Sequence, residues 1–243
     1  MDLGIEGRVA IVTAGSRGLG RASAEALAAE GVDLVLCARS EGPLQEAAQA
    51  ARDLGVHVEA IAADVSDPTT PERLVASALE RFARLDIVVA NAGGPPSGRA
   101  LDVDDDAIRA AVEANMLSAV RLVRSSVPHM RAGGWGRVCC ISSYSIVQAI
   151  PTLALSNAAR TGLRAWAKTA AADLAAEGSG ITVNLVCPGP HATERMRELG
   201  GGGAVPMGDP ADFGRVVAFV CSAPAAFMTG AAIVVDGGAT LAL

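Results

Sequence analysis

The stretch Thr13-Ala14-Gly15-Ser16-Arg17-Gly18-Leu19-Gly20 connects a short β-branched run at 8–13 to a helical pattern at 19–30. Glycines at a strand-to-helix turn let the backbone approach a pyrophosphate, and the positive end of the helix dipole favours its charge. A plain tight turn is the alternative, because glycine-rich turns are common. The position directly after the first strand of a βαβ unit favours a dinucleotide site.

Working outward, short apolar runs alternate with Ala-rich amphipathic stretches. Strands are predicted at 8–13, 32–37, 56–62, 87–90, 137–142, 181–186 and 232–235, and helices at 19–30, 41–54, 70–84, 104–131, 157–177 and 210–222. This alternation indicates βαβ units, and strands that are apolar throughout indicate a sheet covered on both faces. We predict one α/β domain over residues 1–243, with a doubly wound parallel sheet of about seven strands. Its ligand site is expected at the carboxyl ends of the strands.

Composition excludes several classes of protein. The 243 residues are 51% hydrophobic, which is enough for a packed core and excludes a disordered protein. The 26 acidic and 20 basic side chains give a net charge of −6, which argues against nucleic-acid binding. No apolar run approaches the ~18 residues of a membrane helix, and the N-terminus lacks the basic start of a secretory signal. The five cysteines form no Cys-x-x-Cys pair, so we expect buried free thiols, no metal and a cytoplasmic location.

Motifs near the ends of the later strands extend the pattern. They are Asp64-Val65, Asn91-Ala92-Gly93-Gly94, Asn115, Val183-Asn184, Pro188-Gly189, Thr193, Thr229-Gly230 and Val235-Asp236-Gly237-Gly238. Together with the glycine turn, they resemble the short-chain dehydrogenase/reductase family over essentially the whole chain. One departure is visible: the first glycine of the family's turn is Ala14 here, and a glycine stands one place later.

The resemblance implies a Rossmann-type fold, helices on both sheet faces, and a nicotinamide cofactor. It implies cofactor contacts from Gly15, Ser16, Arg17, Gly18, Leu19 and Gly20 at the phosphates, Asp64 and Val65 at the adenine, Asn91, Ala92 and Gly93 at the floor of the site, and Pro188, Gly189 and Thr193 at the nicotinamide end. It also implies a catalytic role for Asn115. A homotetramer or dimer is expected from the same resemblance.

The choice of cofactor is expected to depend on the end of the second strand. A carboxylate there usually holds a ribose 2′-hydroxyl, whereas an arginine suits a 2′-phosphate. The chain has Cys37-Ala38-Arg39-Ser40 at this point, with no acid, and Arg17 lies in the glycine turn. NADP(H) is therefore favoured, with NAD(H) as the alternative if both arginines are ordinary surface residues.

The catalytic half departs from the family pattern. Members carry a Ser after strand five, a Tyr about thirteen residues on as proton donor, and a Lys four residues later. Here Ser143 takes the serine position, Ser156 the tyrosine position and Arg160 the lysine position; a register shifted by three residues gives Leu153 and Asn157. Arginine stays protonated and relays no proton. Losing a positioned acid typically costs about 10²- to 10⁴-fold in rate, or roughly 3 to 5 kcal/mol.

Two other groups are candidate proton donors. Tyr144, the only tyrosine in the chain, directly follows Ser143, although adjacent strand residues point to opposite sides. Its alternative role is a pocket wall or loop anchor. His191, which follows Pro188-Gly189-Pro190, is the second candidate, because a histidine side chain can donate a proton to a substrate near neutral pH. His57 and His129 are expected at the surface, far from the site.

The stretch 193–209 contains four consecutive glycines, Gly200–Gly203, and takes the place of the family's substrate lid. We interpret it as a mobile lid, or as a loose bridge left by a shortened loop. Arg195 and Arg197 near its start can meet an anionic substrate, although solvated helix charges are the commoner case.

The sequence thus predicts an NADP(H)-dependent oxidoreductase, similar to the 3-oxoacyl-acyl-carrier-protein reductases, that interconverts a small carbonyl compound and a secondary alcohol. A cofactor-binding sensor or partner subunit with little redox activity is the alternative. Dehydration or isomerisation in the same pocket is a third hypothesis, favoured like the second by the absent Tyr and Lys.

Overall fold

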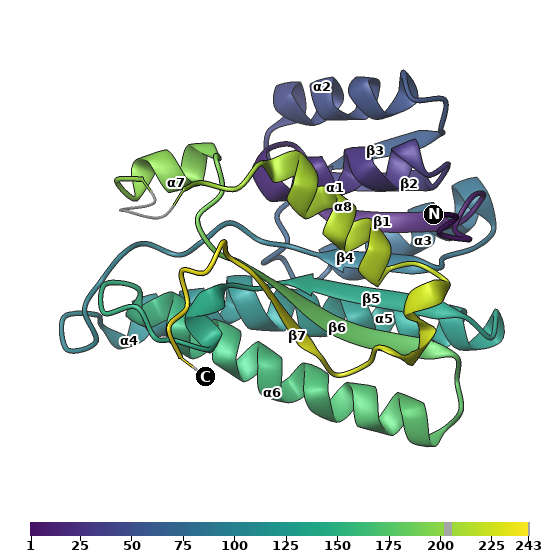
Figure 1. Ribbon diagram of the computed structural model, residues 1–243. Coiled ribbons are helices and arrows are strands. Elements are labelled where there is room, and N and C mark those ends of the chain that lie inside the picture. Colours follow the sequence, from purple (N-terminus) through teal and green to yellow (C-terminus); the bar gives the residue numbers. More distant parts are fainter. Residues whose placement is uncertain (202–205, 243) are drawn as a thin grey trace.

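The computed structural model describes residues 1–201 and 206–242 (Figure 1). Seven strands form one sheet in the order β3-β2-β1-β4-β5-β6-β7, and every neighbouring pair is parallel. Their bounds are β1 (Val9–Thr13), β2 (Asp33–Ala38), β3 (Val58–Ala62), β4 (Ile87–Ala90), β5 (Gly136–Ile141), β6 (Ile181–Pro188) and β7 (Ala232–Val235). The predicted doubly wound parallel sheet is confirmed.

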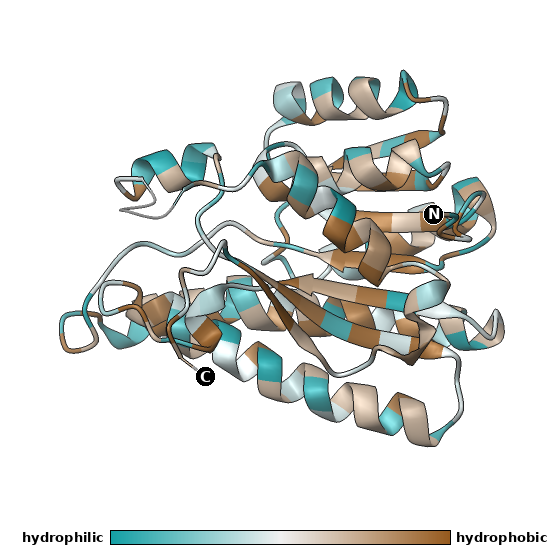
Figure 2. Ribbon diagram, viewed as in Figure 1, coloured by the Kyte–Doolittle hydropathy of each residue, from teal (hydrophilic) through white to brown (hydrophobic). Residues whose placement is uncertain are grey.

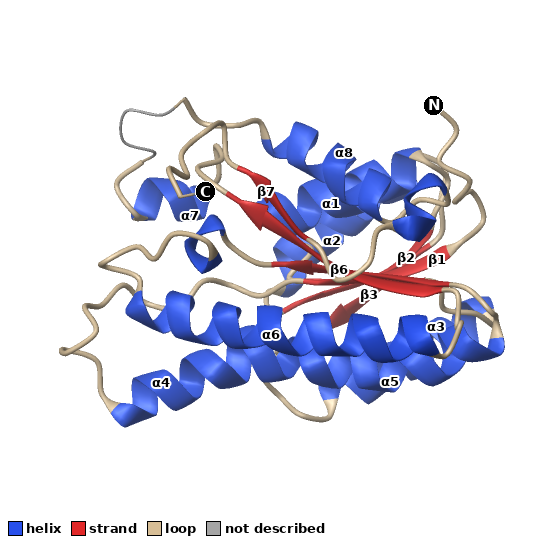
Figure 3. Cartoon of the chain, turned by 60° about the horizontal axis from the view of Figure 1, so that its bottom comes forward, coloured by secondary structure: helices blue, strands red, loops and turns tan. Residues whose placement is uncertain are grey.

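Helices cover both faces of the sheet (Figure 3). They are α1 (Gly18–Ala29), α2 (Glu41–Arg52), α3 (Thr70–Phe82), α4 (Asp105–Val112), α5 (Ser118–Ala132), α6 (Ala154–Ala176), α7 (Glu194–Glu198) and α8 (Pro210–Val220). Buried residues of α3, α5 and α6 form the core on one face, and those of α1, α2 and α8 form the core on the other. Figure 2 shows hydrophobic residues concentrated in the strands, as expected for a sheet buried on both sides.

Alternation along β1 shows how one strand serves both cores. Ile11 packs in the core under α3, α5 and α6, whereas Val12 packs in the core under α1, α2 and α8. Both side chains are fully buried. Successive strand residues point to opposite faces, so an apolar run is needed where both faces are covered.

Three local features differ from the elements predicted by periodicity. The helix expected at 104–131 is divided by a π-helical turn, Glu113–Leu117, between α4 and α5. A short helix, α7, lies in the segment expected to form a lid, and residues 202 and 203 of its glycine run lie outside the described part of the chain. After β5 the chain bends into a 3₁₀ turn, Tyr144–Ile146, so the strand alternation invoked for Tyr144 does not apply.

The order of the strands reverses between β1 and β4. From β1 the chain builds outward through β2 and β3, then crosses to β4 and builds outward through β5, β6 and β7. In such sheets, ligands bind in the crevice outside the carboxyl ends of the strands at this switch point. The Thr13 hydroxyl joins the two central strands there, because it donates to the Asn91 carbonyl and accepts from the Asn91 N–H, both at 2.8 Å.

The structure bears on the expectations for the cysteines and for membrane-spanning helices. All five cysteines are free and buried, as predicted. No helix in the described part of the chain is long and apolar enough to cross a bilayer.

Candidate active site

The glycine turn leads into the N-terminus of α1. Arg17 at the N-cap makes no side-chain capping bond, and the first backbone bond of the helix joins Arg21 N to Arg17 O. The N–H groups of Gly18, Leu19 and Gly20 therefore lack helical acceptors. A Cβ at Gly20 would collide with the Ala14 carbonyl and lie 2.7 Å from Asn91 Nδ2. The close approach of turn, helix and β4 requires glycine here and suits a pyrophosphate.

Ala14 takes the backbone conformation that explains the family's preference for glycine. Its φ is +47°, in the left-handed region, where a Cβ is unfavourable. The following Gly15 donates its N–H to the Cys37 carbonyl of β2 at 3.0 Å. The turn therefore keeps its shape with alanine at the strained position.

The expected floor of the site surrounds a small cavity. It has a volume of about 20 Å³, room for one water molecule. Among the predicted site residues, its walls include Val65, Asn91, Ala92, Asn115 and Arg160. These residues come from the ends of β3 and β4, the π-helical turn and α6, so the fold brings together motifs that are far apart in sequence.

Arg39 and Asp64 lie at the ends of the adjacent strands β2 and β3. Arg39 is exposed, and its charge helps to lower the pKa of the Asp64 carboxyl. The larger causes of that lowered pKa are the two hydrogen bonds that Asp64 Oδ1 accepts from Ser66, from N at 2.9 Å and from Oγ at 2.7 Å. This end of the crevice carries an exposed arginine and a pre-oriented carboxylate.

Ser143 lies in the turn that directly follows β5, and Ser156 lies in the first turn of α6. Ser143 caps the 3₁₀ turn, because its Oγ accepts the Ser145 N–H at 3.1 Å. Ser156 is buried on the inner face of α6, one turn before Arg160. The predicted i,i+4 placement of Ser156 and Arg160 on one buried helix face is present.

Arg160 holds the end of β5 to the π-helical turn. Its Nη1 donates to the carbonyl oxygens of Ile141 at 2.9 Å and Ser142 at 3.0 Å, and its Nη2 donates to Asn115 Oδ1 at 3.0 Å. Three of its five N–H donors are thus used within the protein. Burial, together with the nearby charge of Arg195, lowers the pKa of Arg160 to about 10. The group remains a cation at neutral pH.

Asn115 is presented by the irregular turn within the long helical segment. The Ser118 N–H reaches back five residues to the Glu113 carbonyl, which marks the π-helical turn. Single π turns of this kind are frequent at functional sites. Asn115 is buried and uses its amide oxygen for Arg160.

The two alternative proton donors lie in different surroundings. Burial and then the negative charge of Asp236 raise the pKa of Tyr144, so the phenol lies toward the end of β7. His191 is buried, its Nδ1 is 3.1 Å from the Gly189 carbonyl, and its ring packs edge-on against Phe213 at 5.1 Å. This packing favours a structural role for His191. His57 and His129 are exposed, as predicted.

Pro188 and Gly189 pack against the end of the neighbouring strand. Gly189 donates its N–H to the Val235 carbonyl at 2.9 Å, and a Cβ on Gly189 would collide with Asp236. This contact by itself accounts for glycine at that position, because no side chain fits between the ends of β6 and β7.

Helix α7 spans the crevice. Its N-cap residue Thr193 lies against Gly18 of the glycine turn, and Arg17 forms an ion pair with Glu194 at 3.0 Å. On the far side, Arg195 Nη2 donates to the Pro95 carbonyl at 2.6 Å. The helix therefore bridges the loops that follow β1 and β4.

Sequence reasoning missed several of these contacts. The sequence assigned no role to Thr13 of the glycine turn, although its position at the end of β1 could have indicated a hydrogen bond to the end of β4. The crossing of Arg195 to Pro95 joins residues 100 positions apart, and no sequence signal indicates it.

The fold and the crevice together define a class of protein. The sequence model described as enoyl-(acyl carrier protein) reductase matches residues 13–240. The chain belongs to the short-chain dehydrogenase/reductase family, whose members are NAD(P)-dependent oxidoreductases.

Individual relatives match along nearly the full chain. L-rhamnose 1-dehydrogenase (NAD(P)(+)) of Sphingomonas sp. (strain SKA58) is 31% identical over 96% of each chain. The 3-oxoacyl-acyl-carrier-protein reductase FabG of Escherichia coli (strain K12) is 33% identical over 97% of this chain and 98% of its own. The crystal structure of L-sorbose reductase from Gluconobacter frateurii, complexed with NADPH and L-sorbose, superposes with a TM-score of 0.93 at 32% identity, with both chains fully covered.

Proposed function

We propose that this protein is an NADP(H)-dependent oxidoreductase that interconverts a carbonyl and a secondary alcohol, with a divergent site formed by Ser143, Ser156 and Arg160. The observation that carries the proposal is the crevice at the switch point of the sheet. There the uncapped start of α1, the Thr13–Asn91 link and the buried Arg160–Asn115 pair lie at the ends of adjacent strands.

The residues present fit a dinucleotide. Gly15 to Gly20 would hold the pyrophosphate with backbone N–H groups, because the turn leaves no room for a side chain at Gly20. Asp64 and Val65 would contact the adenine, and Asn91 to Gly93 would form the floor beneath the ribose. Thr193, Pro188 and Gly189 would border the nicotinamide end.

A preference for NADP(H) is supported by the charges at the adenosine end. Arg39 is exposed after β2, where no acid is available for a ribose 2′-hydroxyl. Arg17 lies in the glycine turn but is ion-paired with Glu194, so Arg39 is the arginine we expect to bind the 2′-phosphate. NAD(H) remains the alternative.

A bound reduced nicotinamide supplies a hydride for the carbonyl carbon. The chain's own contribution is to orient the carbonyl and to stabilise negative charge on its oxygen. The hydroxyls of Ser143 and Ser156 would donate hydrogen bonds to that oxygen, and the Arg160 cation favours negative charge near it. Arg160 donates no proton at neutral pH, because its pKa of about 10 keeps it protonated. We expect the proton to come from water or, as the alternative, from Tyr144.

A cofactor-binding sensor with little turnover is the second candidate. The bonding of Arg160 favours this candidate. Its three hydrogen bonds join the end of β5 to Asn115, which is a structural role and not a catalytic one. Both candidates bind nucleotide, so binding alone does not separate them.

The separating experiment is NADPH oxidation by the pure protein with a panel of ketones and β-ketoacyl thioesters. Turnover that falls in Ser156→Ala and Arg160→Lys supports the proposed site. Tight NADPH binding without turnover above background favours the sensor. A fully active Tyr144→Phe variant excludes the phenol as the proton donor.

Replacing Arg39 tests the cofactor preference separately. Arg39→Ala should weaken NADPH binding by about 10- to 100-fold, because a charge-assisted phosphate contact is lost, and should leave NADH binding nearly unchanged. Fluorescence titration of both cofactors measures the two affinities. Equal losses for NADPH and NADH would contradict the assignment.

We also propose a homo-oligomer, a tetramer or dimer. Phe227 is fully exposed just before the edge strand β7, and Val234 within that strand is partly exposed, which supports an interface there. Light scattering of the pure protein measures the mass, and a monomer at micromolar concentration would refute the proposal.

A further inference from the structure

Arg160 is a buried cation at the crevice whose hydrogen-bond partners are all neutral. Only 7% of the residue is exposed, and its three hydrogen bonds end on two backbone carbonyls and the Asn115 amide. Within residues 1–201 and 206–242, no carboxylate forms an ion pair with this guanidinium. A buried cation without an acidic partner is unfavourable unless another species supplies negative charge.

Arg195 of α7 brings a second guanidinium near Arg160. It extends from α7 across Gly94 to the Pro95 carbonyl. A Cβ on Gly94 would lie 3.1 Å from Arg195 Nε, so glycine at this position leaves room for the guanidinium against the backbone. The charge of Arg195 also contributes to the lowered pKa of Arg160, which places each cation in the field of the other.

The acidic partner of Arg195 is held weakly. Glu198, on the same short helix, approaches Arg195 Nη1 at 3.2 Å, and 59% of its side chain is exposed. Exposed ion pairs of this kind contribute little and are readily exchanged. The bond from Nη2 to Pro95 fixes the guanidinium independently and uses one of the two Nη2 hydrogens. Nη1 and the second N–H of Nη2 can therefore pair with another carboxylate in place of Glu198 while the guanidinium keeps its orientation.

We propose that the substrate is a small oxo acid whose carboxylate binds Arg195 in the positive field of Arg160. This inference rests on the proposed function, because the carbonyl must lie in the same crevice. A guanidinium pairs with a carboxylate through two parallel hydrogen bonds, which fixes orientation as well as charge. A neutral carbonyl compound would leave the buried cation uncompensated. Reduction adds a hydride and a proton to the carbonyl and leaves the carboxylate unchanged.

Binding to the NADP⁺-loaded protein tests the inference without turnover. Methyl acetoacetate lacks the negative charge of acetoacetate and adds a single methyl group, and calorimetric titration measures both affinities. The wild type should bind acetoacetate at least about tenfold more tightly than the ester. Arg195→Gln should lose about 10- to 100-fold for acetoacetate and less than about twofold for the ester. Arg195→Lys should recover part of the loss, because the charge returns without the planar fork.

The matched control is Arg215→Gln. Arg215 forms an i,i+3 pair with Asp212 on α8, so the substitution changes the net charge equally at an exposed position away from the crevice. It should leave both affinities unchanged. Equal binding of acid and ester by the wild type, or equal losses of both in Arg195→Gln, would overturn the inference alone. Failure of the wild type to bind NADP⁺, titrated first, would overturn the proposed function as well.

Discussion

Ala14 is the residue at which the glycine turn departs most clearly from favourable local geometry. Its φ of +47° places a Cβ where glycine is preferred, at a cost of roughly 1 to 2 kcal/mol. Ala14→Gly should therefore raise the free energy of unfolding by about 1 kcal/mol and the melting temperature by about 2 to 4 °C. Thermal unfolding followed by circular dichroism measures the change.

Ala83 provides the matched control at the residue scale. It ends α3 with a φ of +58°, far from the crevice, and its N–H donates to the Leu79 carbonyl. Ala83→Gly should stabilise the protein to a similar extent, because the same strain is relieved. An unchanged or lower melting temperature in both variants would refute the explanation from backbone strain.

The sequence could predict the position of a site residue only where that residue comes directly after a β-strand. Asn91 and Asp64 could be placed because each directly follows an apolar run, and parallel strands bring their carboxyl ends to one edge. The partners of Arg160 could not be foreseen, because they lie 18, 19 and 45 residues away and depend on how α6 packs. The catalytic roles of Ser143, Ser156, Arg160, Asn115 and Tyr144 remain predictions.

At the scale of elements, all seven strands were predicted, since buried parallel strands leave continuous apolar runs. Helix α7 was missed because five residues, Glu194–Glu198, carry no apolar periodicity. The π-helical turn was missed because one extra residue per turn barely alters the apolar pattern. Both irregular elements border the crevice, where local propensity and overall fold are expected to disagree.

The junction of β5, α6 and the π-helical turn depends on Arg160. Arg160→Met should lower the free energy of unfolding by about 2 to 4 kcal/mol, because two carbonyls and the Asn115 amide lose buried hydrogen-bond partners. Urea unfolding measures the loss. Arg164→Met, one helical turn later, removes a single bond to the Ile146 carbonyl at 3.2 Å and should cost less than about 1 kcal/mol. Equal effects of the two substitutions would contradict this role.

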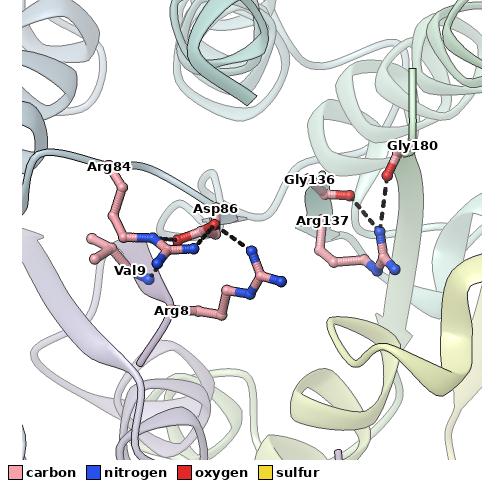
Figure 4. A network of polar contacts seen from close by, with 7 residues as sticks. All are labelled: Arg8, Val9, Arg84, Asp86, Gly136, Arg137 and Gly180. Atoms are coloured by element: carbon pink, nitrogen blue, oxygen red, sulfur yellow. Dashed lines mark hydrogen bonds and ion pairs between the residues drawn. The ribbon is translucent and has the colours of Figure 1, made fainter. Parts of the chain in front are cut away.

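At the scale of the whole molecule, the crevice and the main charge network lie at opposite ends of the sheet. Asp86, which precedes β4, accepts hydrogen bonds from Arg8 at 2.9 Å, from Arg84 at 2.7 and 2.8 Å and from the Val9 N–H at 3.0 Å (Figure 4). On the neighbouring strand, Arg137 donates to the Gly136 and Gly180 carbonyls. This end of the sheet is therefore expected to contribute to stability without affecting cofactor binding.

The stability contributed by Asp86 should depend on pH. Burial alone would raise the pKa of Asp86, but the bonds from Arg84, Val9 and Arg8 outweigh it and lower the pKa. A lowered carboxyl pKa contributes stability that is complete above about pH 5 and is lost as the pH falls through the folded-state pKa. Asp86→Asn should cost about 1 to 3 kcal/mol at pH 7, less at pH 3, and nothing in NADPH affinity. A pH-independent difference in unfolding free energy would contradict this account.

The central claim is that the crevice transfers a hydride to a carbonyl although Ser156 and Arg160 stand where the family carries Tyr and Lys. The most direct measurement is mass spectrometry of the product formed with NADPH deuterated at C4 of the nicotinamide. We predict an alcohol carrying deuterium at the former carbonyl carbon, formed by the wild type and by Tyr144→Phe. Measured NADPH binding with no labelled alcohol from any carbonyl in the panel would contradict the account.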